Sequence, residues 1–371
     1  MKLKNLFGLI CGVATLMVAC EKPAPDNGPV ATGDVTLSVA NYSVEVNTPI
    51  NFIVKDASNV DLTANATIYN KIYVNGKLDD VKEVTNPFTP TADGQYEFYA
   101  VVGTSISNTI KIDVVPTIPA LPEDPQPTNT SFNHRILLVD HTGTNCGFCP
   151  DMMKALKEVE AMEGMHDKYY EAMAHSYNTS DPAFSAAAGS ISTFFGVKKY
   201  PRLTYNFVYD IQSEPNASHI AQQINTLWKE SADAGIAASA SLAATSVVVN
   251  AEVKAAVTNE YRITAWLLED GINGAQLNAS EDWMNIHNNA IRQAANLNPI
   301  SGFDLGNIEA GKCATQAINL AITGAKWNRD NLKVMVIASA KDNAGKFEVV
   351  NVVICPVNDS VTYDYKKIVK L

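Results

Sequence analysis

Two cysteines separated by two residues are the part of this sequence best suited to chemistry. Cys146 and Cys149 lie in the stretch ILLVDHTGTNCGFCPDMMKAL, residues 136–156. An apolar run precedes the pair, and a helix-like stretch follows it. Such a pair suits three kinds of site: half of a zinc site, a structural staple, or a redox-active disulfide.

A zinc site is the weakest of the three interpretations. Structural zinc usually takes four ligands, often from two such pairs, and this chain has no second Cys-x-x-Cys. His134, His141, His166 and His175 are near in sequence but show no recognisable ligand spacing, so we expect no metal. A structural staple stays open, although a disulfide that closes so short a loop stabilises a fold little.

A redox centre explains more of the stretch. Cys146 is expected at the start of the helix that runs through Met153, where amide groups and the helix dipole favour a thiolate. Cys149 follows one turn later on the same face, at a separation that suits a disulfide. We therefore predict that Cys146 is the exposed nucleophile and that Cys149 resolves the mixed disulfide.

The residues around the pair resemble the thioredoxin superfamily. ILLVDHTGTNCGFCP is similar to the family's central strand and active-site turn, and FFGVKKYPRLTYNF is similar to the stretch with the family's cis-proline. The resemblance implies that Asp140 is a buried acid which takes the proton of Cys149, with a pKa raised by burial. It also implies that Pro201 is the cis-proline beside the disulfide, and that Tyr200 and Phe148 face a bound peptide.

The N-terminus is typical of an exported, lipid-tethered protein. A basic start precedes a short apolar run, residues 6–18, which is too short to span a bilayer comfortably and ends in Met-Val-Ala-Cys. This ending resembles a bacterial lipobox. We therefore predict that residues 1–19 are a signal peptide and that a lipid on Cys20 anchors the protein to the membrane.

The chain between the lipid and the cysteines is expected to contain three segments. Residues 20–33 form a flexible tether. Residues 34–115 contain short strand-like runs broken by turn residues, which predicts an immunoglobulin-like β-sandwich without the paired cysteines of antibody domains. Residues 116–131 hold five prolines and are expected to form a stiff linker.

Two further domains are expected after the linker. Residues 132–235 alternate strand and helix patterns, which predicts a central α/β thioredoxin-like domain. Residues 236–371 contain long strand-like runs, which predicts a C-terminal β-sandwich with a helical insertion at residues 283–296. Cys313 and Cys355 lie in this last domain and either form an inter-sheet disulfide or remain buried free thiols.

As a whole, the chain resembles the twenty-eight-kilodalton outer-membrane protein family of anaerobic Gram-negative bacteria, from residue 132 to the C-terminus. The lipobox, TGTNCGFCP and WMNIHNNAIRQ carry this resemblance. It favours a place in the cell envelope. Separately, the net charge of −11 and the low share of charged residues, 18%, make the chain a poor candidate for binding nucleic acid.

Two functions compete. One is a membrane-tethered thiol-disulfide oxidoreductase or isomerase that acts on envelope proteins without a further cofactor. The other is a surface binding or adhesion protein that uses the thioredoxin-like fold as a scaffold, since one fold serves many functions. The combination of Cys146, Cys149, Asp140 and Pro201 favours the first. The reaction direction, the oligomeric state and the membrane face do not follow from the sequence.

Overall fold

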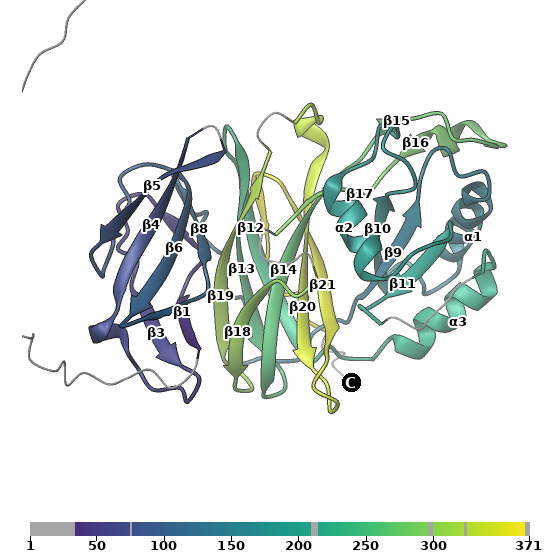
Figure 1. Ribbon diagram of the computed structural model, residues 1–371. Coiled ribbons are helices and arrows are strands. Elements are labelled where there is room, and N and C mark those ends of the chain that lie inside the picture. The colour runs from purple at the N-terminus through teal and green to yellow at the C-terminus, as the bar shows by residue number, and fades with distance from the viewer. Residues whose placement is uncertain (1–33, 75, 209–213, 296–299, 323–324, 368–371) are drawn as a thin grey trace, which may run out of the picture.

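The computed structural model describes residues 34–74, 76–208, 214–295, 300–322 and 325–367. Figure 1 shows three blocks in a row: an N-terminal β block, a middle β block, and an end block that carries the three α-helices. None of the helices in the described ranges is long and apolar enough to cross a bilayer. The predicted signal peptide, the lipidated Cys20 and the tether lie outside the described residues.

The N-terminal block packs a pair of strands against a larger sheet. Its elements are β1 (Val35–Val39), β2 (Ser43–Glu45), β3 (Phe52–Asp56), a 3-10 helix η1 (Thr63–Asn65), β4 (Thr67–Val74), β5 (Lys77–Val84), β6 (Gly94–Val102), β7 (Ser105–Ile106) and β8 (Ile110–Val115). β1 pairs with β3, and the larger sheet has the order β2-β8-β6-β4-β5, with β7 beside β6. Alternate residues such as Leu37, Phe52 and Phe98 fill the core between the two sheets.

The proline-rich segment 116–131 lies along the middle block instead of forming a free spacer. Asn250 donates a side-chain hydrogen bond to the carbonyl of Pro119 at 2.9 Å, and the ammonium group of Lys254 contacts a carboxylate oxygen of Asp124 at 2.8 Å. Both donors belong to a strand of the middle block. These polar contacts fix the segment to that block.

The middle and end blocks share most of their strands. Their elements are β9 (Ile136–Thr142), α1 (Cys149–Ala161), β10 (Tyr169–His175), α2 (Ala186–Phe194), β11 (Arg202–Tyr205), α3 (Ala217–Leu227), β12 (Ala234–Leu242), β13 (Ser246–Ala255), β14 (Asn259–Glu269), β15 (Ile272–Asn273), η2 (Asp282–Asn285), β16 (Ile286–His287), β17 (Ala290–Ala294), β18 (Phe303–Ile308), β19 (Cys313–Ala321), η3 (Arg329–Asn331), β20 (Leu332–Lys341), β21 (Phe347–Pro356) and β22 (Asp359–Val361). A four-stranded sheet of order β19-β13-β12-β22 packs on one side of an eight-stranded sheet of order β11-β9-β10-β17-β14-β20-β21, in which β18 also pairs with β14.

The prediction of a separate central α/β thioredoxin-like domain is wrong. Its strands β11, β9 and β10 continue directly into the C-terminal strands, because β10 pairs in parallel with β17 and β17 pairs with β14. The chain is therefore a β-rich multidomain protein in which one sheet runs through both predicted domains.

Packing explains why this part of the chain does not form a domain of its own. One face of β9 and β10 is covered by α1 and α3, with Ile136 and Leu138 in the core. The other face, which includes Leu137 and Val139, packs into one cluster with α2 and with Trp266 of β14 and side chains of β20 and β21. Strands from both predicted domains therefore share one hydrophobic core, and neither set could bury its apolar face without the other.

The predicted helical insertion at residues 283–296 is also wrong. The described part of this segment contains the end of the short 3-10 helix η2 and then the strands β16 and β17. β17 supplies the pairing that joins β10 to β14. Residues 272–289, which we call the arm, include β15, η2 and β16 and pass over the start of α1 (Figure 1).

Candidate functional site

The two cysteines form a disulfide between a strand and a helix. β9 is buried along its whole length, residues 143–148 turn the chain, and α1 begins at Cys149. Pro150 in the first turn suits a helix start, and Asp151 complements the positive end of the helix dipole. Cys146 therefore lies in the turn before the helix, and the prediction that it begins the helix is wrong by three residues. The Cα atoms of the pair are 5.4 Å apart.

Both cysteines are buried in this oxidised form. Cys146 is 3% exposed and Cys149 is fully buried, so the predicted exposed position of Cys146 is wrong, although it is the less buried of the two. Phe148, which lies between the two cysteines in the sequence, is 74% exposed. The covering residues come from the arm, which is more than a hundred residues further along the chain, and short-range sequence patterns could not reveal it.

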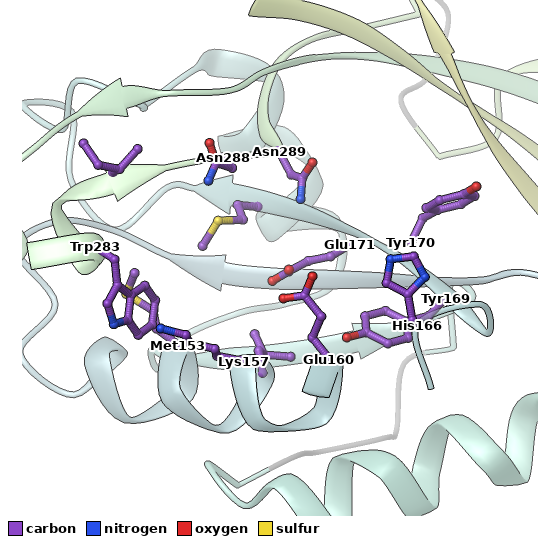
Figure 2. A pocket seen from close by; sticks show the side chains of 13 residues that line it. Met153, Lys157, Glu160, His166, Tyr169, Tyr170, Glu171, Trp283, Asn288 and Asn289 are labelled. Atoms are coloured by element: carbon purple, nitrogen blue, oxygen red, sulfur yellow. The ribbon is translucent and has the colours of Figure 1, made fainter. Parts of the chain in front are cut away.

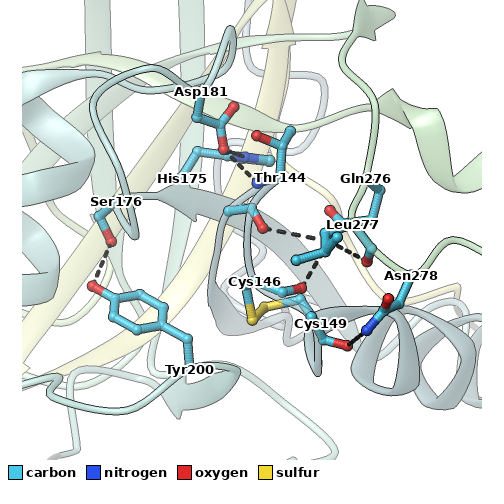
Figure 3. The surroundings of a disulfide bond; sticks show 12 residues. Thr144, Cys146, Cys149, His175, Ser176, Asp181, Tyr200, Gln276, Leu277 and Asn278 are labelled. Carbon is cyan, nitrogen blue, oxygen red and sulfur yellow. Dashed lines mark hydrogen bonds and ion pairs between the residues drawn. A yellow bond between two sulfur atoms is a disulfide. The ribbon is translucent and has the colours of Figure 1, made fainter.

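The arm donates hydrogen bonds to backbone carbonyl groups of the cysteine turn (Figure 3). Gln276 donates to the carbonyl of Cys146 at 2.9 Å, and the side chain of Asn278 donates to the carbonyl of Gly147 at 3.1 Å. Between them, the backbone N–H of Leu277 donates to the carbonyl oxygen of Thr144 at 2.8 Å. These hydrogen bonds satisfy three carbonyl groups of a loop that has no strand partner of its own.

A buried Asp–His pair holds the same turn from the other side. A carboxylate oxygen of Asp181 accepts hydrogen bonds from the backbone N–H of Thr144 at 2.7 Å and from Nδ1 of His175 at 2.8 Å. Burial acts to raise the pKa of Asp181, but the interactions with His175 and the backbone N–H groups outweigh it and lower the pKa to about 2. The ring of His287, from the arm, packs edge-on against His175 at 4.8 Å.

These supporting residues were not predicted from the sequence. His175 ends β10, beside the end of β9, the strand that leads to the cysteines, and a histidine at the end of a strand was the one available signal. Asp181 and Gln276 carried no signal, because their roles depend on contacts between distant loops.

Asp140 is a fully buried carboxylate with no hydrogen-bond partner for either oxygen among the described residues. Asp140 follows Leu138 by two residues on β9, so its side chain lies on the same face as Ile136 and Leu138, which pack against α1. Burial, and then the charge of Glu171 on β10, raise its pKa well above the ordinary value. This is the direction of shift that the sequence predicted.

Of the remaining sequence-predicted site residues, Phe148 belongs to the turn, and Tyr200 contacts residues that lie near it. The Tyr200–Pro201 peptide bond is cis, as predicted. The hydroxyl of Tyr200 is 3.1 Å from that of Ser176, and its ring is 5.3 Å from that of Tyr177. Tyr177 in turn lies against Gly143 at the start of the turn, where an added Cβ would come within 2.6 Å of the tyrosine Cβ.

The structure does not form the inter-sheet disulfide that was one of two alternatives for Cys313 and Cys355. Both are free thiols, and Cys313 is exposed. Cys313 lies on β19, whereas the sulfur of Cys355 contacts the carbonyl of Ala238 on β12. Because β13 lies between β19 and β12, the two sulfur atoms do not meet. Within the described ranges, no three His, Cys, Asp or Glu side chains are grouped as metal ligands.

Comparisons with known proteins agree with the envelope assignment. The family model for outer membrane protein Omp28 matches residues 189–361, which include the arm but not the cysteine pair. No protein with a curated description matches the chain significantly. Among solved structures, HBP35 of Porphyromonas gingivalis matches with 15% identity and a TM-score of 0.51, over 66% of this chain and 81% of that one. At this identity the match shows a shared fold alone.

A second solved structure is too dissimilar to support an argument. It contains three N-terminal domains of the outer capsid protein Hoc of bacteriophage RB49, with 7% identity and a TM-score of 0.15, over 88% of this chain and 70% of that one. The family match carries the conclusion. It confirms the resemblance noted in the sequence: over residues 189–361, this chain is similar to the Omp28 family of outer membrane proteins.

Proposed function

We propose that Cys146 and Cys149 form a redox-active disulfide through which this envelope protein exchanges disulfides with polypeptides. The observation that carries the proposal is Asp140. A buried carboxylate without a partner costs stability, and such groups are concentrated at functional sites. It lies on the face of β9 that is covered by α1, the helix that begins at Cys149, and this placement suits proton exchange with that thiol.

The reaction balances with the groups of the site and a polypeptide dithiol. A substrate thiolate attacks the sulfur of Cys146, the less buried of the pair, and Cys149 leaves as a thiolate that takes a proton from Asp140. A second substrate thiolate then attacks the substrate sulfur of the mixed disulfide and releases Cys146. The substrate dithiol gives two electrons to the protein and two protons to water, and water returns one proton to Asp140 and one to Cys146. The reverse sequence reduces a substrate disulfide.

Exposed apolar side chains around the turn suit an unfolded polypeptide as the substrate. Phe148, Leu277 and Tyr177 are 74%, 51% and 49% exposed. Leu277 lies against Gly147 and Tyr177 against Gly143, so these side chains flank the turn. Exposed apolar residues gathered beside one site indicate an interaction surface more than isolated ones do.

The proposal is tested by reduction of insulin. The reduced full chain should cleave the interchain disulfides of insulin and precipitate its B chain in the presence of dithiothreitol, faster than dithiothreitol alone. The matched control is the Cys146→Ser/Cys149→Ser variant, which should give the rate of dithiothreitol alone. Equal rates for the wild type and this variant would reject the proposal.

Asp140→Asn should slow exchange and increase stability. In the folded state the raised pKa keeps the proton on Asp140, so ionisation above the unfolded pKa near 3.8 costs stability as the pH rises. We expect the variant to be more stable at pH 8, by roughly 1–3 kcal/mol, with a smaller difference at pH 4. Insulin reduction should fall about tenfold or more.

Urea unfolding at the two pH values and the insulin rate measure both effects. Asp151→Asn, an exposed change in the first turn of the same helix, is the matched control and should alter neither quantity by much. A less stable Asp140→Asn protein with an unchanged rate would contradict the assigned role.

A structural disulfide in a binding protein is the second candidate. It is favoured by the burial of both cysteines and by the three hydrogen bonds from the arm, which hold the turn in one shape. In that case the exposed side chains around the turn would bind a partner without thiol exchange.

A further inference from the structure

A cavity of about 600 Å³ lies beside the C-terminal half of α1, over the face of β10 and under the arm (Figure 2). Met153 and Lys157 of α1, Met173 of β10 and Trp283 of the arm contribute to its lining. Met153 follows Cys149 by four residues, so the cavity begins about 6 Å along the helix from the disulfide. The proposed thiol chemistry makes no use of it.

Two carboxylates face each other across this cavity. Figure 2 shows Glu160, from the last turn of α1, and Glu171, from β10, with their carboxylate groups pointing toward one another. Burial, and then the charge of Glu160, raise the pKa of Glu171 to about 7. The C-terminal end of α1 adds further negative potential near Glu160.

Within the described parts of the chain, these two carboxylates are not neutralised by an ion pair. Glu160 and Glu171 have no hydrogen-bond or ion-pair partner among the described residues. The nearest lysine of the helix, Lys157, places its ammonium group over the ring of Trp283, 4.1 Å from the ring centre. Lys333 lowers the pKa of Glu171 but forms its ion pair with Asp270 at 2.6 Å.

The walls of the cavity are suited to an organic cation. Trp283 and Tyr169 provide aromatic faces, and the ammonium group of Lys157 already lies over the ring of Trp283. Asn288 and Asn289 add amide groups at the rim (Figure 2). A bare metal ion would find only two carboxylates here, whereas a flat organic cation could use the carboxylates and the rings together.

We infer that this cavity binds the guanidinium group of an arginine side chain in a peptide. A guanidinium group donates paired hydrogen bonds to a carboxylate and stacks on aromatic rings. Its three-carbon stem suits apolar contacts with Met153 and Met173. A volume of about 600 Å³ also leaves room for neighbouring parts of the peptide.

The assignment predicts a pH-dependent affinity. Glu171 must ionise to hold the cation, so binding should strengthen roughly tenfold between pH 6 and pH 8. The charged or titratable groups around Glu171 are Glu160 and Lys157 on α1, Asp140 on β9, Lys333 on β20, and Tyr169 and His166 at the cavity wall. His166→Asn should leave the pH trend in place, because the trend is assigned to Glu171.

Calorimetric titration of the full chain with acetyl-arginine-amide tests the inference. Acetyl-citrulline-amide has nearly the same shape without the charge and should bind roughly tenfold more weakly or not at all. Acetyl-lysine-amide shows whether a guanidinium group is preferred over an ammonium group. Glu160→Gln and Glu171→Gln should each weaken arginine binding about fivefold or more. Glu158→Gln, on the opposite side of α1, should change it less than twofold.

Both glutamine variants remove repulsion between carboxylates and should melt at or above the temperature of the wild type, so a loss of binding cannot be attributed to unfolding. Absence of arginine binding at millimolar concentration would overturn the inference and leave the two carboxylates as a pair that shares a proton. Equal binding of citrulline, stronger binding of lysine, or wild-type affinity in both glutamine variants would also overturn it.

Discussion

Cys149→Ala should capture substrate polypeptides as stable mixed disulfides, whereas Cys146→Ala should capture none. Attack at Cys146 survives in the first variant, but the thiol that releases the mixed disulfide is missing. In the second variant the remaining thiol is fully buried at the start of α1. We expect at least a tenfold difference in captured protein between the two variants.

Affinity purification from envelope extracts, followed by non-reducing electrophoresis and mass spectrometry, measures the captured protein. Cys313→Ala is the matched control, since Cys313 is an exposed free thiol on β19, away from the turn. Its removal from Cys149→Ala should leave the capture unchanged. Capture that depends on Cys313, or that is stronger in Cys146→Ala, would contradict the assignment of Cys146 as the attacking thiol.

Lys254→Met should strongly destabilise the folded protein. The ammonium group of Lys254 is buried and contacts Asp124, Tyr365 and the carbonyls of Gln126 and Pro127. Burial alone would lower its pKa, but these partners raise it. Removing the cation leaves Asp124 and the carbonyls without their donor, which should cost about 3–5 kcal/mol.

Urea unfolding measures this loss, and limited proteolysis of residues 116–131 should become faster as the segment is released from β13. Lys312→Met, an exposed lysine next to β19, is the matched control and should cost less than about 0.5 kcal/mol. Adding Asp124→Leu to Lys254→Met should recover part of the loss, because it removes the uncompensated charge. A loss of under about 1 kcal/mol for Lys254→Met would contradict the structural role given to this ion pair.

The local features of the site could be predicted from the sequence. A buried run ending at Asp140, a turn, and Pro150 at a helix start are all short-range patterns, and the structure places the disulfide between strand and helix. The raised pKa of Asp140 was expected from the resemblance to the thioredoxin superfamily, which implies a buried acid at this position. Cys146 was expected at the start of the helix but lies in the turn before it, because the turn continues through Phe148.

The features that were wrong or missed depend on contacts between distant segments. Residues 290–294 were predicted to belong to a helical insertion, and nothing in their local pattern indicates that they pair with β10 and so join two predicted domains in one eight-stranded sheet. The arm contacts Cys146 and Gly147 through the side chains of Gln276 and Asn278, in a segment whose local pattern is that of an ordinary loop. The pKa values of Asp181 and Glu171 are shifted by burial and by neighbours on other elements, and neither cause can be read from the sequence.

The reduction potential of the Cys146–Cys149 pair tests the central claim most directly. The full chain would be equilibrated in glutathione buffers of graded potential, and the disulfide fraction measured by differential alkylation and mass spectrometry. Disulfide exchange predicts a midpoint between about −120 and −270 mV, the range of proteins that catalyse it. A midpoint below about −300 mV, typical of structural disulfides, or a pair that no buffer reduces in the folded protein, would contradict it.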